Sequence, residues 1–128
     1  MTSKPQPRSV AAGGTATTRL LLALRLGWGL LLLIRPGVAR EVVDPGRRLP
    51  AWSIPVLRVL GVRHVAQALV TTARPTRTVF VLGAVSDALH ALSAVGYAVT
   101  GRPGRSAALR DAAVAGGAGV AWASRARR

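Results

Sequence analysis

The chain has 128 residues, which suits a single domain, and its 18 Lys and Arg residues against 4 Asp and Glu give a formal net charge of +14. Half of the residues are hydrophobic, which excludes disorder for most of the chain, and the absence of Cys excludes disulfides, thiolate catalysis and cysteine metal sites. The three Trp, one Tyr and one Phe are too few for an aromatic surface that stacks on nucleic acid. These values predict a small basic membrane protein.

The N-terminal part of the chain contains a polar segment and then an apolar one. Residues 1–17 are mostly small, polar, Gly or Pro, and they predict a flexible basic tail. Residues 18–34 are rich in Leu and contain one interior charge, Arg25. This first block ends before Pro36, because proline disfavours a helical residue directly before it. In the loop that follows, we expect a short surface helix around residues 38–43.

Three further apolar blocks follow, at about 53–73, 77–100 and 106–124, before a basic end at 125–128. We expect Ser53 to cap the second block and Ser106 to cap the fourth. Each block is long enough for a helix to cross a hydrocarbon core of about 30 Å. The short connections make neighbouring helices antiparallel. The sequence therefore predicts an all-α fold, a four-helix transmembrane bundle with antiparallel up-down topology that spans 18–124.

The four blocks differ in their drive to enter a membrane. Ten Leu and Ile residues in the first block outweigh Arg25 by roughly 2 kcal/mol on an insertion scale. The fourth block is mostly Ala and Gly and has little drive, so we expect the second to fourth blocks to insert as a set with polar groups turned inward. A soluble bundle would need a polar face on every helix, which the first block lacks. An alternative interpretation is that the first block is a signal peptide cleaved near residues 37–39. Arg25 within the apolar run and Arg35 directly after it argue against this interpretation.

Two of the four acids lie inside apolar blocks and need partners there. Asp87 and Arg63 each lie 12 residues from the centre of the turn at 74–76, so an antiparallel hairpin places them at equal depth. We therefore prefer the pair Arg63–Asp87, with Arg25 as the other candidate partner. Near the start of the fourth block, Asp111 lies at the expected depth of Arg58, which predicts a second pair.

Polar residues also follow helical spacing in the second and third blocks. Ser86, His90, Ser93 and Tyr97 predict a stripe along the third block. Arg63, Gln67 and Thr71, flanked by His64, predict a facing stripe on the second. The candidate intramembrane polar cluster comprises Arg25, Arg58, Arg63, His64, Gln67, Asp87, His90 and Asp111. Such stripes either hydrogen-bond the helices together or line a ligand pocket or proton path, and the sequence leaves both open.

No motif in the sequence predicts catalysis. The chain has no Gly-x-Ser-x-Gly nucleophile signature and no phosphate-binding glycine loop. His64, His90 and Asp87 do not have the spacing of a known metal-ligand motif, so we expect no catalytic residue, no metal site and no cofactor. In the fourth block, small residues spaced as in Ala115 and Gly119 predict either an internal packing face or a dimer face.

Charge and aromatic residues near the block ends indicate orientation and partners. With four spans, the side that holds both termini carries eight Lys and Arg residues against six on the other, which favours cytoplasmic termini. Trp52, Tyr97 and Trp122 fall near block ends, where interfacial anchors lie. All basic residues but Lys4 are Arg, and Ala, Val and Gly abound, a usage that suggests a GC-rich bacterial genome. Together with the apolar blocks, it predicts a protein of the bacterial plasma membrane.

The partners that we expect are membrane lipids, with anionic headgroups at the basic ends, and a second copy or another membrane protein. Nucleic acid is not an expected partner. These features predict a non-enzymatic interaction or lipid-associated membrane protein. The alternative function is a small-molecule or proton transporter, or a ligand-binding bundle, that uses the polar cluster.

Three short runs resemble a known family. Residues 25–30 with Arg35-Pro36, residues 57–64 and residues 83–89 are similar to the first three helices of small four-helix bacterial membrane proteins of unknown function, distantly DoxX-like. The resemblance covers about residues 18–124. It implies four membrane helices and no established activity. His64 stands where that pattern has an acid.

Overall fold

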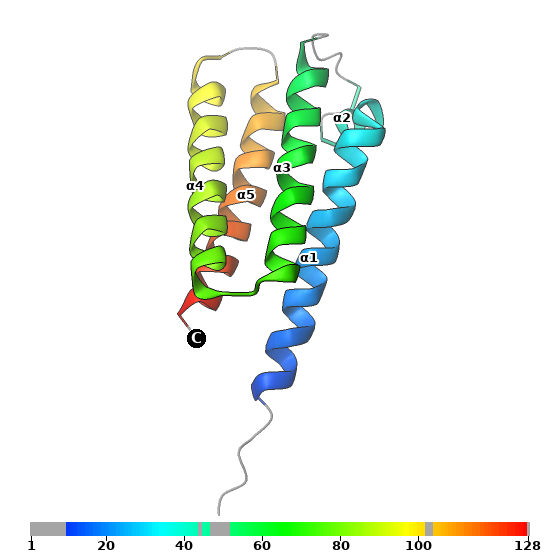
Figure 1. Ribbon diagram of the computed structural model, residues 1–128. Helices are drawn as coiled ribbons and strands as arrows, with labels where there is room; N and C mark the ends of the chain where they lie inside the picture. The colour runs from blue at the N-terminus through cyan, green and yellow to red at the C-terminus, as the bar shows by residue number, and fades with distance from the viewer. Residues whose placement is uncertain (1–9, 44, 47–51, 102–103, 128) are drawn as a thin grey trace, which may run out of the picture.

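The computed structural model describes residues 10–43, 45–46, 52–101 and 104–127, and all regular secondary structure among them is helical. Four of the helices are long and one is short. In Figure 1 the long helices run alongside one another, and the short helix lies near one end. The helices are α1 (Val10–Ile34), α2 (Pro36–Val43), α3 (Ser53–Ala73), α4 (Arg77–Val99) and α5 (Arg105–Ala126).

The helix boundaries agree closely with the apolar blocks, with one large difference. α1 begins at Val10, eight residues before the expected boundary, so residues 10–17 are helical and not part of a tail. This segment contains three Ala residues, which have the highest helix propensity and let the Leu-rich helix extend toward the N-terminus. The rest of the expected tail, residues 1–9, lies outside the described residues.

The helix starts differ from the expected caps. Ser53 and Ser106 do not occupy N-cap positions, because α3 is preceded by Trp52 and α5 by Gly104. Gly104 has φ of +92°, a left-handed conformation that glycine adopts without steric cost. The side-chain cap belongs to Thr76, whose hydroxyl accepts a hydrogen bond from the Val79 backbone N–H at 3.3 Å. This cap fixes the start of α4 directly after the turn from α3.

The four long helices pack as two close pairs, α1 with α3 and α4 with α5. Successive long helices run in opposite directions, so the C-terminus and the start of α1 lie at one end and α2 lies at the other (Figure 1). Few residues of α3 approach α4, and within the described helices no Cα atom of α1 lies within 8 Å of α4 or α5. The space between the two pairs holds the polar residues.

Small residues allow the close approach within each pair. A Cβ atom built on Gly61 of α3 would lie 2.8 Å from the Gly29 carbonyl oxygen of α1, so the two backbones nearly touch. On α5, Gly119 lies against α4, where a Cβ would come 3.4 Å from the Ala84 carbonyl oxygen. Ala115 is buried on the same face. The small residues at 115 and 119 therefore form an internal packing face.

The surface of the protein is more apolar than the surface of a water-soluble helical protein. Val99, Ile34 and Val114 are each more than 70% exposed, while much of the buried core consists of alanine. Three segments are long and apolar enough to cross a membrane, Ala16–Ile34, Ser53–Ala73 and Arg77–Val99. These features indicate a membrane protein, because such a surface is stable only against lipid. The Ala- and Gly-rich α5 is not among the three, so the count falls one short of the four spans expected.

Candidate functional site

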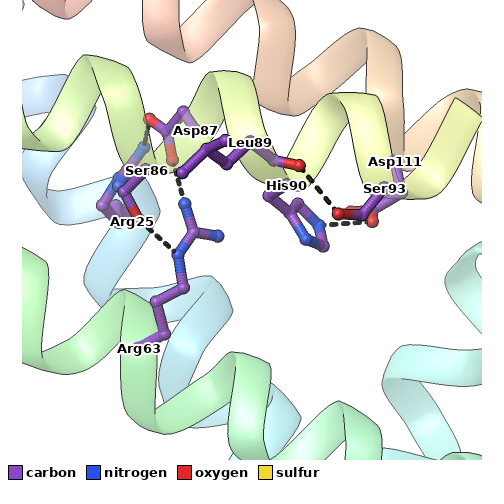
Figure 2. Close-up of polar contacts among 8 residues, drawn as sticks. All are labelled: Arg25, Arg63, Ser86, Asp87, Leu89, His90, Ser93 and Asp111. Carbon is purple, nitrogen blue, oxygen red and sulfur yellow. Dashed lines mark hydrogen bonds and ion pairs between the residues drawn. The ribbon is translucent and has the colours of Figure 1, made fainter.

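Asp87 of α4 lies at the centre of the polar residues and is fully buried. Its Oδ2 accepts a hydrogen bond from Arg25 Nη2 of α1, and its Oδ1 accepts one from Arg63 Nη2 of α3 at 2.6 Å (Figure 2). Arg63 Nε also donates to the Ser86 hydroxyl at 2.9 Å. One carboxylate thus joins three helices, and both partners that the sequence offered for Asp87 are present.

The Arg25 side chain is the more deeply held of the two arginines. Its side chain is 6% exposed, against 22% for Arg63. The guanidinium carbon lies 5.5 Å from the ring centroid of Trp122 on α5, within range of a cation–π interaction. Trp122 stacks in turn on Phe80 of α4, with centroids 5.8 Å apart. Arg25 therefore contacts both members of the α4–α5 pair, although the α1 backbone is remote from them.

A second polar pair lies one helical turn along α4 from Asp87. His90 Nε2 and Asp111 Oδ2 of α5 are 2.6 Å apart (Figure 2). The side chains are 16% and 32% exposed, so this pair is more accessible than Asp87 at 1%. The expected pair Arg58–Asp111 is wrong. Arg58 is exposed on α3, and no Cα atom of α3 lies within 8 Å of α5, whereas α5 packs directly against α4.

A cavity of about 580 Å³ lies between α1 and α5, and we refer to it as the lateral cavity. Apolar residues such as Leu21 and Leu24 of α1 and Val114 and Ala118 of α5 form its walls. Its back wall is polar and consists of Arg25, His64, Asp87, His90 and Asp111. At one end Arg125 of α5 donates a hydrogen bond to Thr18 of α1, and at the other end α2 packs on α5. The separation of α1 from α5 leaves this cavity open on its side.

A second cavity of about 360 Å³ lies toward α2, and we refer to it as the α2-side cavity. It extends from Arg40 of α2 and Trp52, past Tyr97 of α4, to the polar residues. Four residues line both cavities, namely Trp28, His64, His90 and Asp111. The two cavities therefore meet at the His90–Asp111 pair.

The two expected polar stripes face each other over part of their length. Ser86 meets Arg63 through a hydrogen bond, and Gln67 lies so close to Gly83 of α4 that a Cβ there would be 2.7 Å from the amide nitrogen. Thr71, with 4% of its surface exposed, is also buried on this side of α3. Ser93 departs from the expected interhelical role, because its hydroxyl donates to the Leu89 carbonyl of its own helix. The stripes therefore bind α3 to α4 at one end and line the α2-side cavity at the other.

Several buried polar atoms around these cavities have no hydrogen-bond partner among the described residues. They include Arg25 Nη1, His64 Nδ1 and Arg40 Nε. Buried polar groups in folded proteins are nearly always paired with protein, water or ligand. The lateral cavity therefore offers hydrogen-bonding groups to a further molecule at Arg25 and His64.

Sequence reasoning missed Trp122 as part of the site and treated it as an interfacial anchor. Trp122 is 3% exposed and stacks inside the protein. The spacing of Asp111, Ala115 and Ala118 with Trp122 is a helical i, i+4, i+7, i+11 series, and all four residues line the lateral cavity. That spacing was the signal in the sequence. Trp52, by contrast, is 56% exposed.

The described residues contain no group of three or more His, Asp or Glu side chains able to hold a metal ion. The chemistry of the site is instead that of charge-assisted hydrogen bonds in an apolar surrounding. No protein-family model, curated protein or solved structure matches the chain. Its function is therefore inferred from the residues and geometry of the site.

Proposed function

We propose that this chain is a non-enzymatic protein of the bacterial plasma membrane that binds a small, membrane-soluble molecule in the lateral cavity. In this proposal α1, α3, α4 and α5 form a four-helix transmembrane bundle with both termini in the cytoplasm. The excess of Lys and Arg near the ends of the chain supports that orientation. The runs at 25–30, 57–64 and 83–89 support membership of a DoxX-like family of small membrane proteins.

The observation that carries the proposal is the composition of the lateral cavity. Its volume of about 580 Å³ falls within the roughly 300–1,000 Å³ of small-molecule sites. Apolar walls with a few convergent polar groups are typical of such sites. The cavity lies between α1 and α5, whose outward residues include Leu24 and Val114, exposed by 62% and 71%. A molecule dissolved in the bilayer reaches this opening without passing through water.

The charges of the site favour an uncharged ligand. Arg25 and Arg63 carry two positive charges, and Asp87 and Asp111 carry two negative charges when ionised. These charged side chains balance two against two, so an added charge on the ligand would be unpaired in a medium of low polarity. Arg25 Nη1 still has a hydrogen to donate. The proposed ligand is thus a largely apolar, uncharged molecule with one hydrogen-bond-accepting group.

The proposal is tested by filling the cavity. Ala118→Trp places a large ring in the lateral cavity, and Val120→Trp places the same ring on the outward face of α5, where Val120 is 70% exposed. Both variants and the wild type are purified, and organic extracts are analysed by mass spectrometry. We expect about one co-purified small molecule per chain in the wild type and in Val120→Trp, and a loss in Ala118→Trp. Equal yields in all three proteins would contradict the proposal.

A second role is association of the basic ends with anionic lipid. Arg74 and Arg77 are exposed at the turn between α3 and α4, which lies at the same end of the molecule as the end of α5 (Figure 1). Each basic residue near an anionic leaflet contributes about 1 kcal/mol of attraction. We expect Arg74→Gln with Arg77→Gln to weaken retention of phosphatidylglycerol by the purified protein, whereas Arg58→Gln, which lies within α3, leaves it unchanged. Equal phosphatidylglycerol content in both variants would contradict this role.

A further inference from the structure

The α2-side cavity lies between one end of the molecule and the polar residues. It is bounded by the part of the chain that includes Trp52 and Gly104, at the end of the molecule where α3 and α5 begin. Asp111 lies six residues after the start of α5, a depth of about 9 Å at the helical rise. His90 lies nine residues before the end of α4, a depth of about 14 Å. The polar pair is thus nearer to this end than Asp87 is.

Unpaired polar atoms mark both ends of this cavity. At the α2 end, Arg40 Nε is buried and has no hydrogen-bond partner among the described residues. At the inner end, His64 Nδ1 is likewise buried without a hydrogen-bond partner among them. Ser53 and Tyr97 add polar groups between them. A cavity holds stable water when it has room and offers several polar partners, and 360 Å³ is ample room. Apolar ligands alone would leave these nitrogen atoms unsatisfied.

The exposure of the acids separates the two parts of the polar cluster. The Asp111 side chain is 32% exposed, whereas that of Asp87 is 1% exposed and is enclosed by two arginines. Of the two acids, Asp111 lines both cavities together with its partner His90, whereas Asp87 lines the lateral cavity alone. Figure 2 shows the His90–Asp111 pair apart from the contacts of Asp87. An imidazole hydrogen-bonded to a carboxylate is a common proton-exchanging unit.

We propose that the α2-side cavity is a water-filled entry that carries protons between the α2 end of the molecule and the His90–Asp111 pair, where it meets the lateral cavity. The charged and titratable groups that share a cavity with the pair are His64 from α3, Tyr97 from α4, Arg40 at the α2 end, and Arg25 with Asp87, which also binds Arg63. The site is then reached by lipid-soluble molecules from the side and by protons from one aqueous face. The entry does not depend on the ligand proposed above.

The first test measures water access with single cysteines, for which a chain without native Cys is well suited. Ala94→Cys and Ala108→Cys place thiols in the α2-side cavity. Leu92→Cys, at nearly the same depth on α4 but 69% exposed on the outward face, is the lipid control, and Thr100→Cys at the end of α4 is the water control. The probe is the membrane-impermeant sulfonatoethyl methanethiosulfonate, added to both faces of proteoliposomes.

Only thiols that meet water ionise and react. We expect both cavity cysteines to react at least about 100-fold faster than Leu92→Cys, because the thiolate is the reactive form. If either cavity cysteine is as slow as Leu92→Cys while Thr100→Cys reacts, the water entry is wrong. If the lateral cavity still holds a co-purified molecule when the water entry fails this test, the proposed ligand site is not contradicted.

The second test measures proton delivery. The chain has two histidines, so ¹⁵N-labelled His gives signals from His64 and His90 alone. Ala94→Trp fills the α2-side cavity, and Leu92→Trp puts the same ring on the lipid face. We expect hydrogen exchange of the His90 imidazole with D₂O to slow by about tenfold or more in Ala94→Trp and not in Leu92→Trp. Unchanged exchange in folded Ala94→Trp would overturn the proton route.

Discussion

Arg63 of α3 and Asp87 of α4 form an ion pair at 2.6 Å across the boundary between the two helix pairs. Because few other residues of α3 and α4 approach one another, this contact and the one from Arg25 are among the few side-chain contacts that join the two halves. A buried ion pair does not by itself prove stability, since desolvation of the charges opposes their attraction. Removal of one partner of the pair nonetheless destabilises the protein, because the other charge stays buried without compensation.

Asp87→Asn is expected to destabilise the protein by about 3–5 kcal/mol, because it leaves two buried guanidinium groups without a counter-charge. The measurement is unfolding in mixed micelles, followed by circular dichroism. Glu41→Gln is the control, since Glu41 is exposed and its carboxylate accepts a hydrogen bond from the Gly46 backbone N–H.

A triple variant separates charge compensation from a general loss of packing. Arg25→Met, Arg63→Met and Asp87→Leu together remove all three charges and keep much of the apolar volume. Such replacements of buried ionic groups are often neutral, so we expect the triple variant to be more stable than Asp87→Asn. A triple variant that is less stable than Asp87→Asn would contradict this explanation. The destabilisation of Asp87→Asn could then not be attributed to the two arginine charges that it leaves without a counter-charge.

Trp122→Leu is expected to cost about 2–4 kcal/mol, since it opens a hole beside Phe80 and removes the ring under Arg25. The matched control is Trp52→Leu, at a tryptophan that is 56% exposed. Thermal unfolding monitored by the remaining tryptophan fluorescence measures both. Equal midpoints for the two variants would mean that Trp122 is an interfacial residue, as its position near a helix end had predicted.

The helices and the central ion pair were accessible from the sequence because they depend on local patterns. Prolines and apolar runs set the ends of α3 and α4 to within one residue, and equal distances from a three-residue turn placed Arg63 beside Asp87. The start of α1 was wrong because eight residues of small side chains have no apolar period, although they are compatible with a helix. Periodicity identifies buried faces, not the limits of helix propagation.

The partner of Asp111 was not accessible because depth alone does not determine which helix lies beside which. Arg58 and Asp111 were matched in depth, but α5 packs against α4, so Asp111 meets His90. The small residues of α5 decide that arrangement, through the close approach at Gly119. The spacing of these small residues predicts a close helix contact, but it does not identify which helix makes that contact.

Membrane extraction checks the apolar surface. We expect the protein to stay in the membrane pellet after washing with high salt and with alkaline carbonate, and to be released by detergent, because Val99, Ile34 and similar side chains are exposed on long apolar helices. A peripheral basic protein would behave differently, since salt screens its attraction to anionic lipid. Release by salt alone would contradict the membrane assignment. Immunoblotting of the fractions gives the result.

Gly61→Ala is expected to force α1 and α3 apart. A Cβ at residue 61 would lie 2.8 Å from the Gly29 carbonyl oxygen and 2.8 Å from the Leu33 side chain, and backbone cannot move aside as a flexible side chain can. Overpacking of this kind costs about 1–3 kcal/mol. Gly96→Ala on α4 is the matched control, because nothing lies within 4 Å of a Cβ there and alanine favours a helix by about 1 kcal/mol.

The expected result is a lower unfolding midpoint for Gly61→Ala and an equal or higher one for Gly96→Ala. The same displacement would alter the cavities, because His64 lies beside Gly29 on the facing helix. Gly61→Ala should therefore also lower the yield of co-purified small molecule, whereas Gly96→Ala should retain it. A stable Gly61→Ala that keeps the ligand would mean that α1 and α3 are not in contact at this point.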